Sequence, residues 1–260
     1  MSYAMPATET IASELLDEVA QLYMITPRRS DSFEMDIMRR KRQIQKGIRN
    51  LIQANPEDGY AVQMTFASAL GDVSEIHHSY RVAYQYLQDV ISLVQNYAVS
   101  LHVAGESEEA VKVLREHTRE LDGNVTLRRY LASFLIDHGR FQEASEVLKD
   151  ILQYQDSDIF EDYERYCDVY TFLEDREIEQ DVISSYMSLV QEIVREEHLC
   201  LMPQAIGVVG DGDGKWLSIV TDTEGLNSSH LAELNERIVD DALDAELPPA
   251  VLMNCVTRFV

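Results

Sequence analysis

The chain of 260 residues is long enough for one large domain or two modest ones, and its 45% hydrophobic content can supply a buried core. Only 11 Gly and 6 Pro residues argue against long disordered linkers and against a turn-rich all-β fold. The 46 acidic residues outnumber 22 Lys and Arg, and this net charge of −24 disfavours nucleic acid as a partner and favours a protein with a basic surface, although solubility alone explains most of the carboxylates.

Targeting signals and cysteines indicate where the chain works. Cys167, Cys200 and Cys255 lie far apart and form no CxxC motif, which predicts free thiols in a reducing compartment. The N-terminus has neither the basic nor the apolar region of a signal peptide, and no apolar run is long enough for a membrane span. We therefore expect a cytoplasmic protein that does not contact a membrane and holds no cofactor or metal.

The N-terminal part is predicted to be a pair of helices that forms a first domain over residues 1–56. Apolar side chains recur at helical spacing over residues 11–23 and again over residues 32–54. Asn55 and Pro56 end the second helix, because a residue before proline avoids the helical conformation.

A basic stretch lies within the second predicted helix and just before it. It contains eight of the 22 basic residues, namely Arg28, Arg29, Arg39, Arg40, Lys41, Arg42, Lys46 and Arg49. We interpret it as internal charge balance, in which a basic helix packs beside acidic ones. The alternative is contact with nucleic acid or another anionic partner, although no aromatic ladder for stacking bases accompanies it in the sequence.

Residues 57–199 are predicted to form a second domain of successive short helices. The breaks between them fall near Gly71, Gly105, Gly123, Gly139, Asp156 and Glu174. Helices of about 14 residues are marginal alone, so we expect them to pack as antiparallel pairs.

Within this domain the sequence repeats with a period of about 34 residues. The matched positions are small or apolar: Ala98 with Ala132, Leu101 with Leu135, Gly105 with Gly139, Ala110 with Ala144, and Leu114 with Leu148. The alanines allow two helices to approach closely, the glycines can end a helix in the left-handed conformation, and the leucines fill the seam. The repeat therefore predicts helix hairpins.

These positions resemble the tetratricopeptide repeat (TPR), most clearly over residues 90–156. The segment YLASFLIDHGRFQEASEVL supplies the small residue, turn glycine, aromatic residue, alanine and large apolar residue of the family as Ala132, Gly139, Phe141, Ala144 and Leu148. The segment before it departs from the pattern, with Ser107 in the aromatic position. Both segments lack the family's tryptophan and proline, and any antiparallel helical array can imitate the rest.

The period extends less clearly in both directions. Before the two good repeats, Gly71 is in phase, with Val73, Ile76 and Tyr80 as weak matches; after them, the matches at Val169, Ile178 and Val182 are weaker still.

The resemblance implies a curved array whose first helices line a binding surface for a peptide or helix of another protein. The outward positions of those helices are Ser92, Gln95, Val99, His102, Thr126, Arg129, Ser133 and Ile136. Apart from Arg129, this set lacks the Lys, Asn and Arg residues with which some family members clamp a C-terminal carboxylate. A partner helix with apolar anchors and basic flanks suits it better.

Residues 200–260 are predicted to form a small ββαβ domain. Two β-branched runs over residues 204–223 flank a turn rich in Gly and Asp, which indicates a β-hairpin. A helix over residues 229–245 follows, and residues 250–260 are predicted as a buried strand. The apolar face of the helix is predicted to contain Leu231, Leu234, Ile238, Val239 and Ala242. Candidate caps of the helix are Asn227, Ser228 and Ser229. An exposed edge of this sheet would allow homo-oligomers.

The sequence contains no set of residues that indicates a catalytic or metal site. The glycine-rich residues 211–215 lack the spacing of a phosphate loop and are predicted to be a turn. The histidines, including His77 and His78, show no ligand spacing. Ser228, Ser229, His230 and Asp222 suggest a catalytic triad, but no GxSxG motif occurs and helix capping explains these residues. Tyr80, Tyr84, Tyr86 and Tyr97 are interpreted as core and groove fillers.

The predicted fold class is mainly α, an antiparallel helix-hairpin (TPR-like) array with a small C-terminal α+β (ββαβ) domain. The leading hypothesis is an adaptor, chaperone or inhibitor-like protein that binds one polypeptide partner, with a basic surface or an amphipathic helix. One alternative is an acidic antagonist of a basic protein, such as an antitoxin, an immunity protein or a nucleic-acid mimic. Another is a small enzyme with its site in the C-terminal α/β part.

Overall fold

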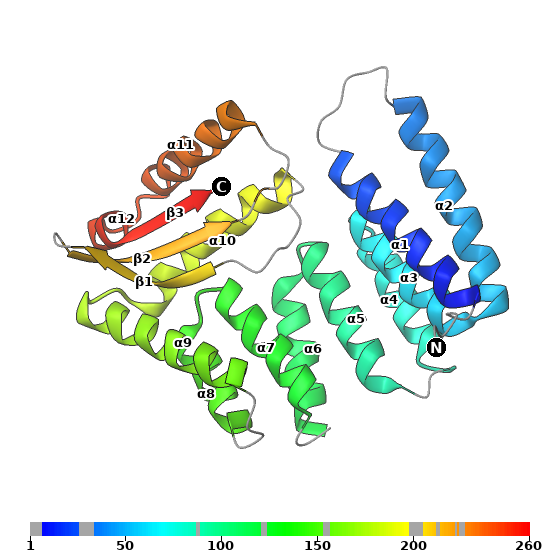
Figure 1. Cartoon of the computed structure of the whole chain (residues 1–260), viewed down its shortest axis with the longest axis horizontal. Helices are drawn as coiled ribbons and strands as arrows, with labels where there is room; N and C mark the ends of the chain where they lie inside the picture. The colour runs from blue at the N-terminus through cyan, green and yellow to red at the C-terminus, as the bar shows by residue number, and fades with distance from the viewer. Residues whose placement is uncertain are drawn as a thin grey trace, which may run out of the picture. The chain divides into compact units, whose positions relative to one another are not determined.

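The chain forms two compact units, Met1–Glu120 and Leu121–Val260, which we call the N-terminal and C-terminal units. The computed structural model (Figure 1) describes residues 7–260 except 26–33, 87–88, 121–123, 153–156, 198–204, 212–213, 222 and 224–226. Within these residues it contains twelve helices and one three-stranded sheet, which confirms a mainly helical fold with a small C-terminal sheet. No described helix is long and apolar enough to cross a membrane.

The N-terminal unit begins with the two predicted helices, α1 (Ala7–Ile25) and α2 (Glu34–Ala54), and continues into α3 (Pro56–Ala69). The three helices share one core, which contains Leu15, Val19, Leu22, Ile37, Ile44, Ile48, Leu51, Val62 and Phe66. Asn55 separates α2 from α3 and caps α3, because its side chain accepts a hydrogen bond from the backbone N–H of Asp58. The predicted N-terminal pair therefore packs as part of a larger helical body.

Helix hairpins follow in both units. They pair α3 with α4 (Val73–Ala83), α5 (Val90–Val103) with α6 (Ser107–Glu120), and α7 (Val125–Asp137) with α8 (Phe141–Ile151). Two longer helices come next: α9 (Ser157–Asp175), which packs against α8, and α10 (Gln180–Glu196). The predicted breaks near Gly123 and Asp156 lie outside the described residues.

Each of the three hairpins turns at a glycine in the left-handed conformation. The φ angle is +69° at Gly71, +91° at Gly105 and +68° at Gly139. The glycine N–H donates to the carbonyl three residues earlier, and the following N–H donates to the carbonyl five residues before it. This is the Schellman arrangement, which satisfies carbonyls that the helix end leaves without partners. The same turn therefore recurs with the period of the sequence repeat.

The turn between α9 and α10 has the same hydrogen bonds without a glycine. Glu177 has φ +54°; its N–H donates to the carbonyl of Glu174, and the N–H of Ile178 donates to that of Leu173. A residue with a Cβ pays about 1 to 2 kcal/mol in this conformation, whereas glycine does not.

We expect Glu177→Gly to raise the free energy of unfolding by about 1 kcal/mol, because glycine relieves the cost of the left-handed conformation. The matched control is Gly71→Ala, which should lower it by about 1 kcal/mol. A Cβ at Gly71 would meet no atom within 4 Å, so only the backbone conformation opposes alanine there. Urea unfolding of the full chain measures both changes, and a loss of stability in Glu177→Gly would contradict this account.

The residues that match between the two repeats lie inside the hairpins. All of the alanines and leucines are buried, namely Ala98, Leu101, Ala110, Leu114, Ala132, Leu135, Ala144 and Leu148. The side chain of Gln180 on α10 also donates a 2.6 Å hydrogen bond to the carbonyl of Gly139. The α7–α8 turn is therefore fixed from inside its own hairpin and from α10.

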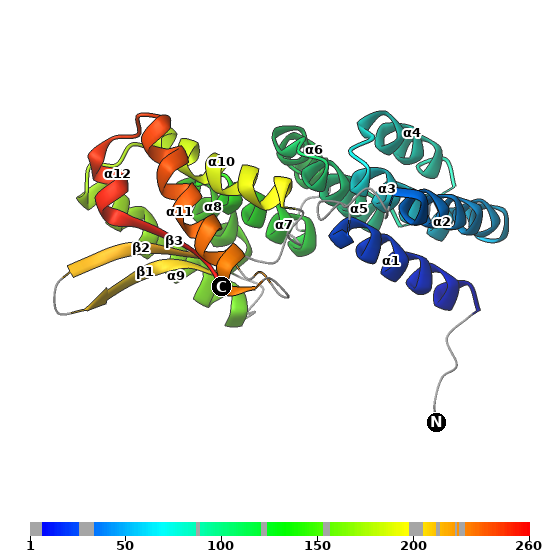
Figure 2. The ribbon, with the colours of Figure 1, turned by 90° about the horizontal axis from the view of Figure 1, so that it is seen from above.

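The C-terminal unit ends in a sheet of order β1 (Ala205–Asp211), β2 (Gly214–Thr221), β3 (Cys255–Phe259). Strands β1 and β2 form the predicted antiparallel hairpin, and β3 pairs in parallel with β2. Such a parallel pair needs a crossover, which α11 (Ser228–Asp244) and α12 (Pro249–Asn254) supply. Helix α9 contacts β1 and α11 contacts β3 (Figure 2), and the hydroxyl groups of Tyr186 on α10 and Thr257 on β3 lie 2.9 Å apart.

The structure corrects two details of this part. The sequence predicts one strand over residues 250–260, but the first half of this segment is helix α12. Proline suits the first position of a helix, as at Pro249, because the N–H that it lacks would have no partner within the helix there. Val239 was assigned to the apolar face of α11 but is 54% exposed, whereas Leu234, Ile238 and Ala242 are buried. Asn227 is the cap of α11, since its side chain accepts from the backbone N–H of His230.

Candidate functional site

A hollow in the C-terminal unit runs along α7 beside α8 and α9. Its volume is about 510 Å³. It is lined by Thr126, Arg129, Tyr130, Ala132, Ser133, Ile136 and Asp137 of α7, by Leu148 of α8, and by Asp162, Arg165 and Tyr166 of α9. We call it the α7–α9 hollow. Its size suits one or two side chains of a polypeptide or a small ligand.

An aromatic pair supports one wall of this hollow. Tyr166 is buried and stacks on Phe141, with ring centroids 6.4 Å apart and an angle of 22° between the planes. Burial, followed by the nearby Asp162 carboxylate, raises the pKa of Tyr166 to about 12. Tyr166 therefore presents a neutral ring and hydroxyl at ordinary pH, which suits an apolar or hydrogen-bonding guest.

Charged side chains also line the hollow. Arg165 forms an ion pair of 2.5 Å with Asp162, and its guanidinium carbon lies 5.5 Å from the centre of the Tyr166 ring. The lining contains two arginines and two aspartates, so it is balanced in charge. The sequence from 121 to 260, in contrast, carries 29 acidic against 10 basic residues. The balanced lining suits an apolar side chain, and the acidic composition of this part of the chain favours a partner with basic residues.

Four of the eight predicted groove residues meet in this hollow. Thr126, Arg129, Ser133 and Ile136 all come from α7. The other four, Ser92, Gln95, Val99 and His102, are their counterparts one repeat earlier and lie on α5 in the N-terminal unit. The hydroxyl of Ser92 donates a 2.6 Å hydrogen bond to Asp89 at the start of α5, so Ser92 takes part in capping that helix.

The last residue of each predicted set is less accessible than expected. His102 and Ile136 are both only 6% exposed. The first and last positions of each set are ten residues apart. At 3.6 residues per turn, the last side chain lies about 80° around the helix from the first, so it turns toward neighbouring helices. The exposed members of the stripe on α7 are therefore Thr126, Arg129 and Ser133.

A cluster of histidines and tyrosines joins α4, α5 and α6. The rings of Tyr80 and Tyr97 stack with centroids 3.9 Å apart, and the Tyr97 hydroxyl lies 2.8 Å from Nδ1 of His77. His77 in turn lies 3.9 Å from Glu109. Burial, then the Glu109 carboxylate, raises the pKa of Tyr97 to about 12, which makes its hydroxyl a poor nucleophile near neutral pH. The cluster is therefore suited to holding three helices together.

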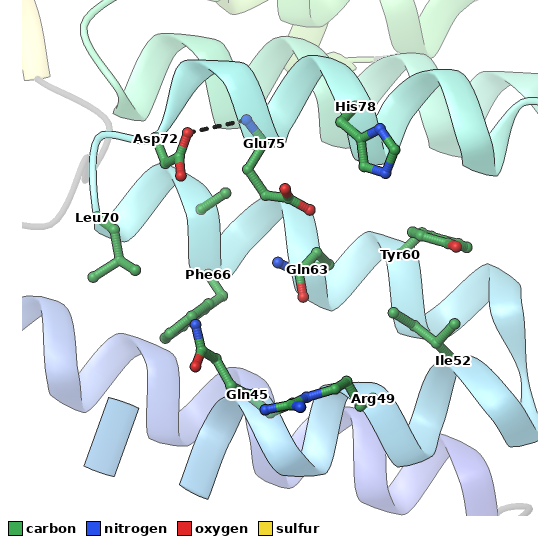
Figure 3. Close-up of a pocket in the computed structure, with 11 residues that line it drawn as sticks. Gln45, Arg49, Ile52, Tyr60, Gln63, Phe66, Leu70, Asp72, Glu75 and His78 are labelled. Atoms are coloured by element: carbon green, nitrogen blue, oxygen red, sulfur yellow. Dashed lines mark hydrogen bonds between the residues drawn. The ribbon is translucent and has the colours of Figure 1, made fainter. Parts of the chain in front are cut away.

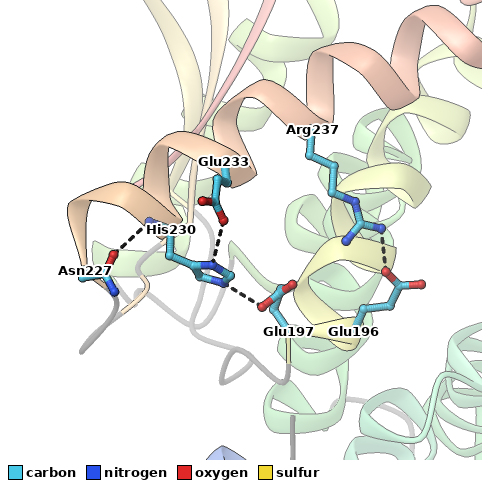
Figure 4. Close-up of polar contacts among 6 residues, drawn as sticks. All are labelled: Glu196, Glu197, Asn227, His230, Glu233 and Arg237. Carbon is cyan, nitrogen blue, oxygen red and sulfur yellow. Dashed lines mark hydrogen bonds and ion pairs between the residues drawn. The ribbon is translucent and has the colours of Figure 1, made fainter. Parts of the chain in front are cut away.

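His230 binds carboxylates of two helices. Its Nε2 lies 2.8 Å from Glu197 at the end of α10, and its Nδ1 lies 3.4 Å from Glu233 on α11 (Figure 4). Beside it, Arg237 of α11 contacts Glu196 of α10 at 2.5 Å. Both ring nitrogens of His230 face carboxylates, so this group ties α11 to α10. Asp222, the acid considered for a triad, lies outside the described residues.

Two further observations bear on identity and on metals. No protein-family model, curated protein or solved structure matches this chain. In the described part, no three His, Cys, Asp or Glu side chains are grouped so that they could hold a metal ion. The resemblance to the TPR family therefore depends on the residues themselves.

Proposed function

We propose that this chain is a TPR-like interaction protein that binds a polypeptide partner in the α7–α9 hollow. The observation that carries the proposal is that three exposed residues of the sequence-derived stripe, Thr126, Arg129 and Ser133, open onto one hollow of about 510 Å³. Schellman turns that recur in step with the sequence repeat support the assignment to repeats.

The chemistry around the hollow favours an amphipathic helix as the partner. An apolar side chain would enter between Tyr166 and Leu148, which are buried. Basic residues beside that anchor would face the acidic surface of the C-terminal unit, where acidic residues outnumber basic ones by 29 to 10. This is the helix-in-groove mode of recognition, with apolar anchors at helical spacing.

We expect Ser133→Arg to weaken binding of such a partner about tenfold, a change of about 1.4 kcal/mol. Ser133 is exposed in the hollow, so a long cationic side chain would fill the space and repel basic flanks without disturbing the core. Peptides selected from a displayed random library on the full chain supply the ligand, and fluorescence anisotropy measures the dissociation constant.

The control is Ser185→Arg, an equal change at an exposed serine of α10 that does not line the hollow. It should leave the dissociation constant within about twofold. Failure to enrich any peptide, or equal affinity of enriched peptides for Ser133→Arg and the parent chain, would refute binding in this hollow.

A second candidate function is an acidic antagonist of a basic protein, which the charge of the C-terminal unit favours. It would bind through a wide charged surface, so affinity would fall steeply with salt and would not depend on residue 133. The same two serine variants, tested at low and high salt, separate this function from binding in the hollow.

A further inference from the structure

The face of α2 that points away from the core is basic. Arg39, Arg42, Lys46 and Arg49 follow each other at steps of three or four residues, which places them in one row about 15 Å long. All four are exposed, whereas Ile37, Ile44, Ile48 and Leu51 on the opposite face are buried in the core. We call this row the α2 basic stripe.

These cations form no ion pair with a described acidic side chain, and Arg49 donates only to the carbonyl of Gln45 in its own helix, at 3.3 Å. The sequence predicts a basic helix packed beside acidic ones, and α2 does pack against α1, which carries Glu14, Asp17 and Glu18 and no Lys or Arg. This packing leaves the four cations of the stripe without an ion pair to a described acidic side chain. The four exposed cations are therefore accessible to a ligand, on a chain whose net charge is −24.

A hollow of about 430 Å³ adjoins this stripe, between α2, α3 and α4 (Figure 3). Phe66 and Ala67 of α3 are buried and Ile52 of α2 is partly buried, so they give the hollow an apolar base. Arg49 stands on the α2 side and Glu75 on the α4 side. We call it the α2–α4 hollow.

We propose that the α2–α4 hollow and the α2 basic stripe together bind an acidic peptide segment of a partner protein. Arg49 belongs to both features, so a segment with one large apolar side chain in the hollow would place its neighbouring carboxylates beside Arg49, Lys46 and Arg42. Charge-assisted hydrogen bonds from arginine to carboxylate favour this pairing.

A peptide fits this surface better than a nucleic acid. Asp72 and Glu75 line the α4 side of the hollow and would repel a phosphate backbone that entered it, whereas an uncharged side chain is tolerated there. The acidic residues elsewhere repel both kinds of ligand equally, and at physiological salt this repulsion is screened over about 8 Å. The local contacts therefore decide the class of partner.

This site differs from the one proposed above in two ways. It lies in the N-terminal unit, and its partner segment is acidic. The α7–α9 hollow would take a segment with basic flanks, and the α2–α4 hollow an acidic one. A chain with both sites could join two partners of opposite charge, and each site can fail its test without affecting the other.

The test uses a panel of synthetic peptides, each with one central Trp flanked by Glu and Asp, and the full chain at physiological salt. We expect saturable binding, and the double variant Arg42→Glu/Lys46→Glu should weaken it about tenfold, or about 1.4 kcal/mol. Both side chains are exposed and neither belongs to the core, so the variant should fold. Replacement of the peptide Trp by Ser should weaken binding to a similar degree, because the hollow would then stay empty.

The matched control is Lys112→Glu/Arg119→Glu, which makes the same change of charge at exposed positions of α6 in the same unit. It should alter affinity by less than about twofold, and so should Ser133→Arg in the other unit. Absence of saturable binding, equal losses in both double variants, or tighter binding of a single-stranded oligonucleotide than of every peptide would overturn the proposal.

Discussion

Replacement of Gly59 by alanine should lower the free energy of unfolding of the N-terminal unit by about 3 kcal/mol. Gly59 is buried in α3 where this helix meets α2. A Cβ at this position would lie 2.6 Å from both the backbone nitrogen and the Cα of Ile52. A backbone atom cannot rotate out of the way, so α2 and α3 would have to move apart and lose core contacts.

Gly47→Ala is the matched control in the neighbouring helix. A Cβ there would also approach another atom to 2.6 Å, but this atom is Cδ2 of Leu15, at the end of a side chain that can change rotamer. Alanine also favours the helix interior over glycine by about 1 kcal/mol, which offsets the strain. We therefore expect a change near zero.

Hydrogen exchange of peptides from α1 to α3, followed by mass spectrometry, measures both variants in the unit concerned. Gly59→Ala should also weaken binding of acidic peptides, because Ile52 and Tyr60 line the α2–α4 hollow on either side of the contact. Equal stability of the two variants would show that α2 can shift without loss, which would contradict the packing described here.

The hairpins of this fold are predictable because the residues that form them are local. The glycine that makes each turn and the alanines and leucines that fill each seam lie within one repeat of the sequence. The break between α4 and α5 was missed, since it contains neither Gly nor Pro; it ends at Asp89, whose side chain caps α5 by accepting from Ile91 and Ser92. A capping aspartate is a weaker sequence signal than a turn glycine.

The period fails after Gly139 for a structural reason. The next turn of this kind is at Glu177, later in the chain than the period places it, because α9 has 19 residues whereas α7 has 13. An extrapolation of the period therefore falls out of phase, which explains the weak matches at Val169, Ile178 and Val182. The end of the chain was ambiguous because a short apolar run fits a strand or a helix equally well.

The candidate site was only half predictable. The row on α7 follows from helical spacing, so Thr126, Arg129 and Ser133 could be named from the sequence. The depth of the hollow comes from Arg165 and Tyr166 on α9, which the fold brings beside α7 across a separation in sequence that no local pattern records. The basic residues of the α2 basic stripe can be named from the sequence. Only the structure shows that they form no ion pair with a described acidic side chain.

Raising the pH from 10 to 12 should destabilise both units, each by about 2 kcal/mol from a single tyrosine. Tyr97 in the N-terminal unit and Tyr166 in the C-terminal unit have pKa values of about 12, raised mainly by burial. A tyrosine in the unfolded chain has a pKa of about 10. Over this range the native state keeps a proton that the unfolded state has released, so stability is complete below pH 10 and falls by about 1 kcal/mol per pH unit for each group.

Phenylalanine substitutions separate the two contributions. Tyr97→Phe removes the hydroxyl beside His77, so it should cost about 1 kcal/mol at neutral pH and reduce the alkaline loss in the N-terminal unit alone, where burial also raises the pKa of Tyr80 and leaves part of the slope. Tyr166→Phe should flatten only the loss in the C-terminal unit, where burial also raises the pKa of the Cys255 thiol to about 12 and leaves part of the slope. Pulse proteolysis in urea at several pH values, with fragments identified by mass spectrometry, reads each unit separately. Unchanged slopes in both variants would mean that the native state ionises these tyrosines without a penalty, and the stacked Tyr80–Tyr97 and Phe141–Tyr166 pairs would then have to be open to water.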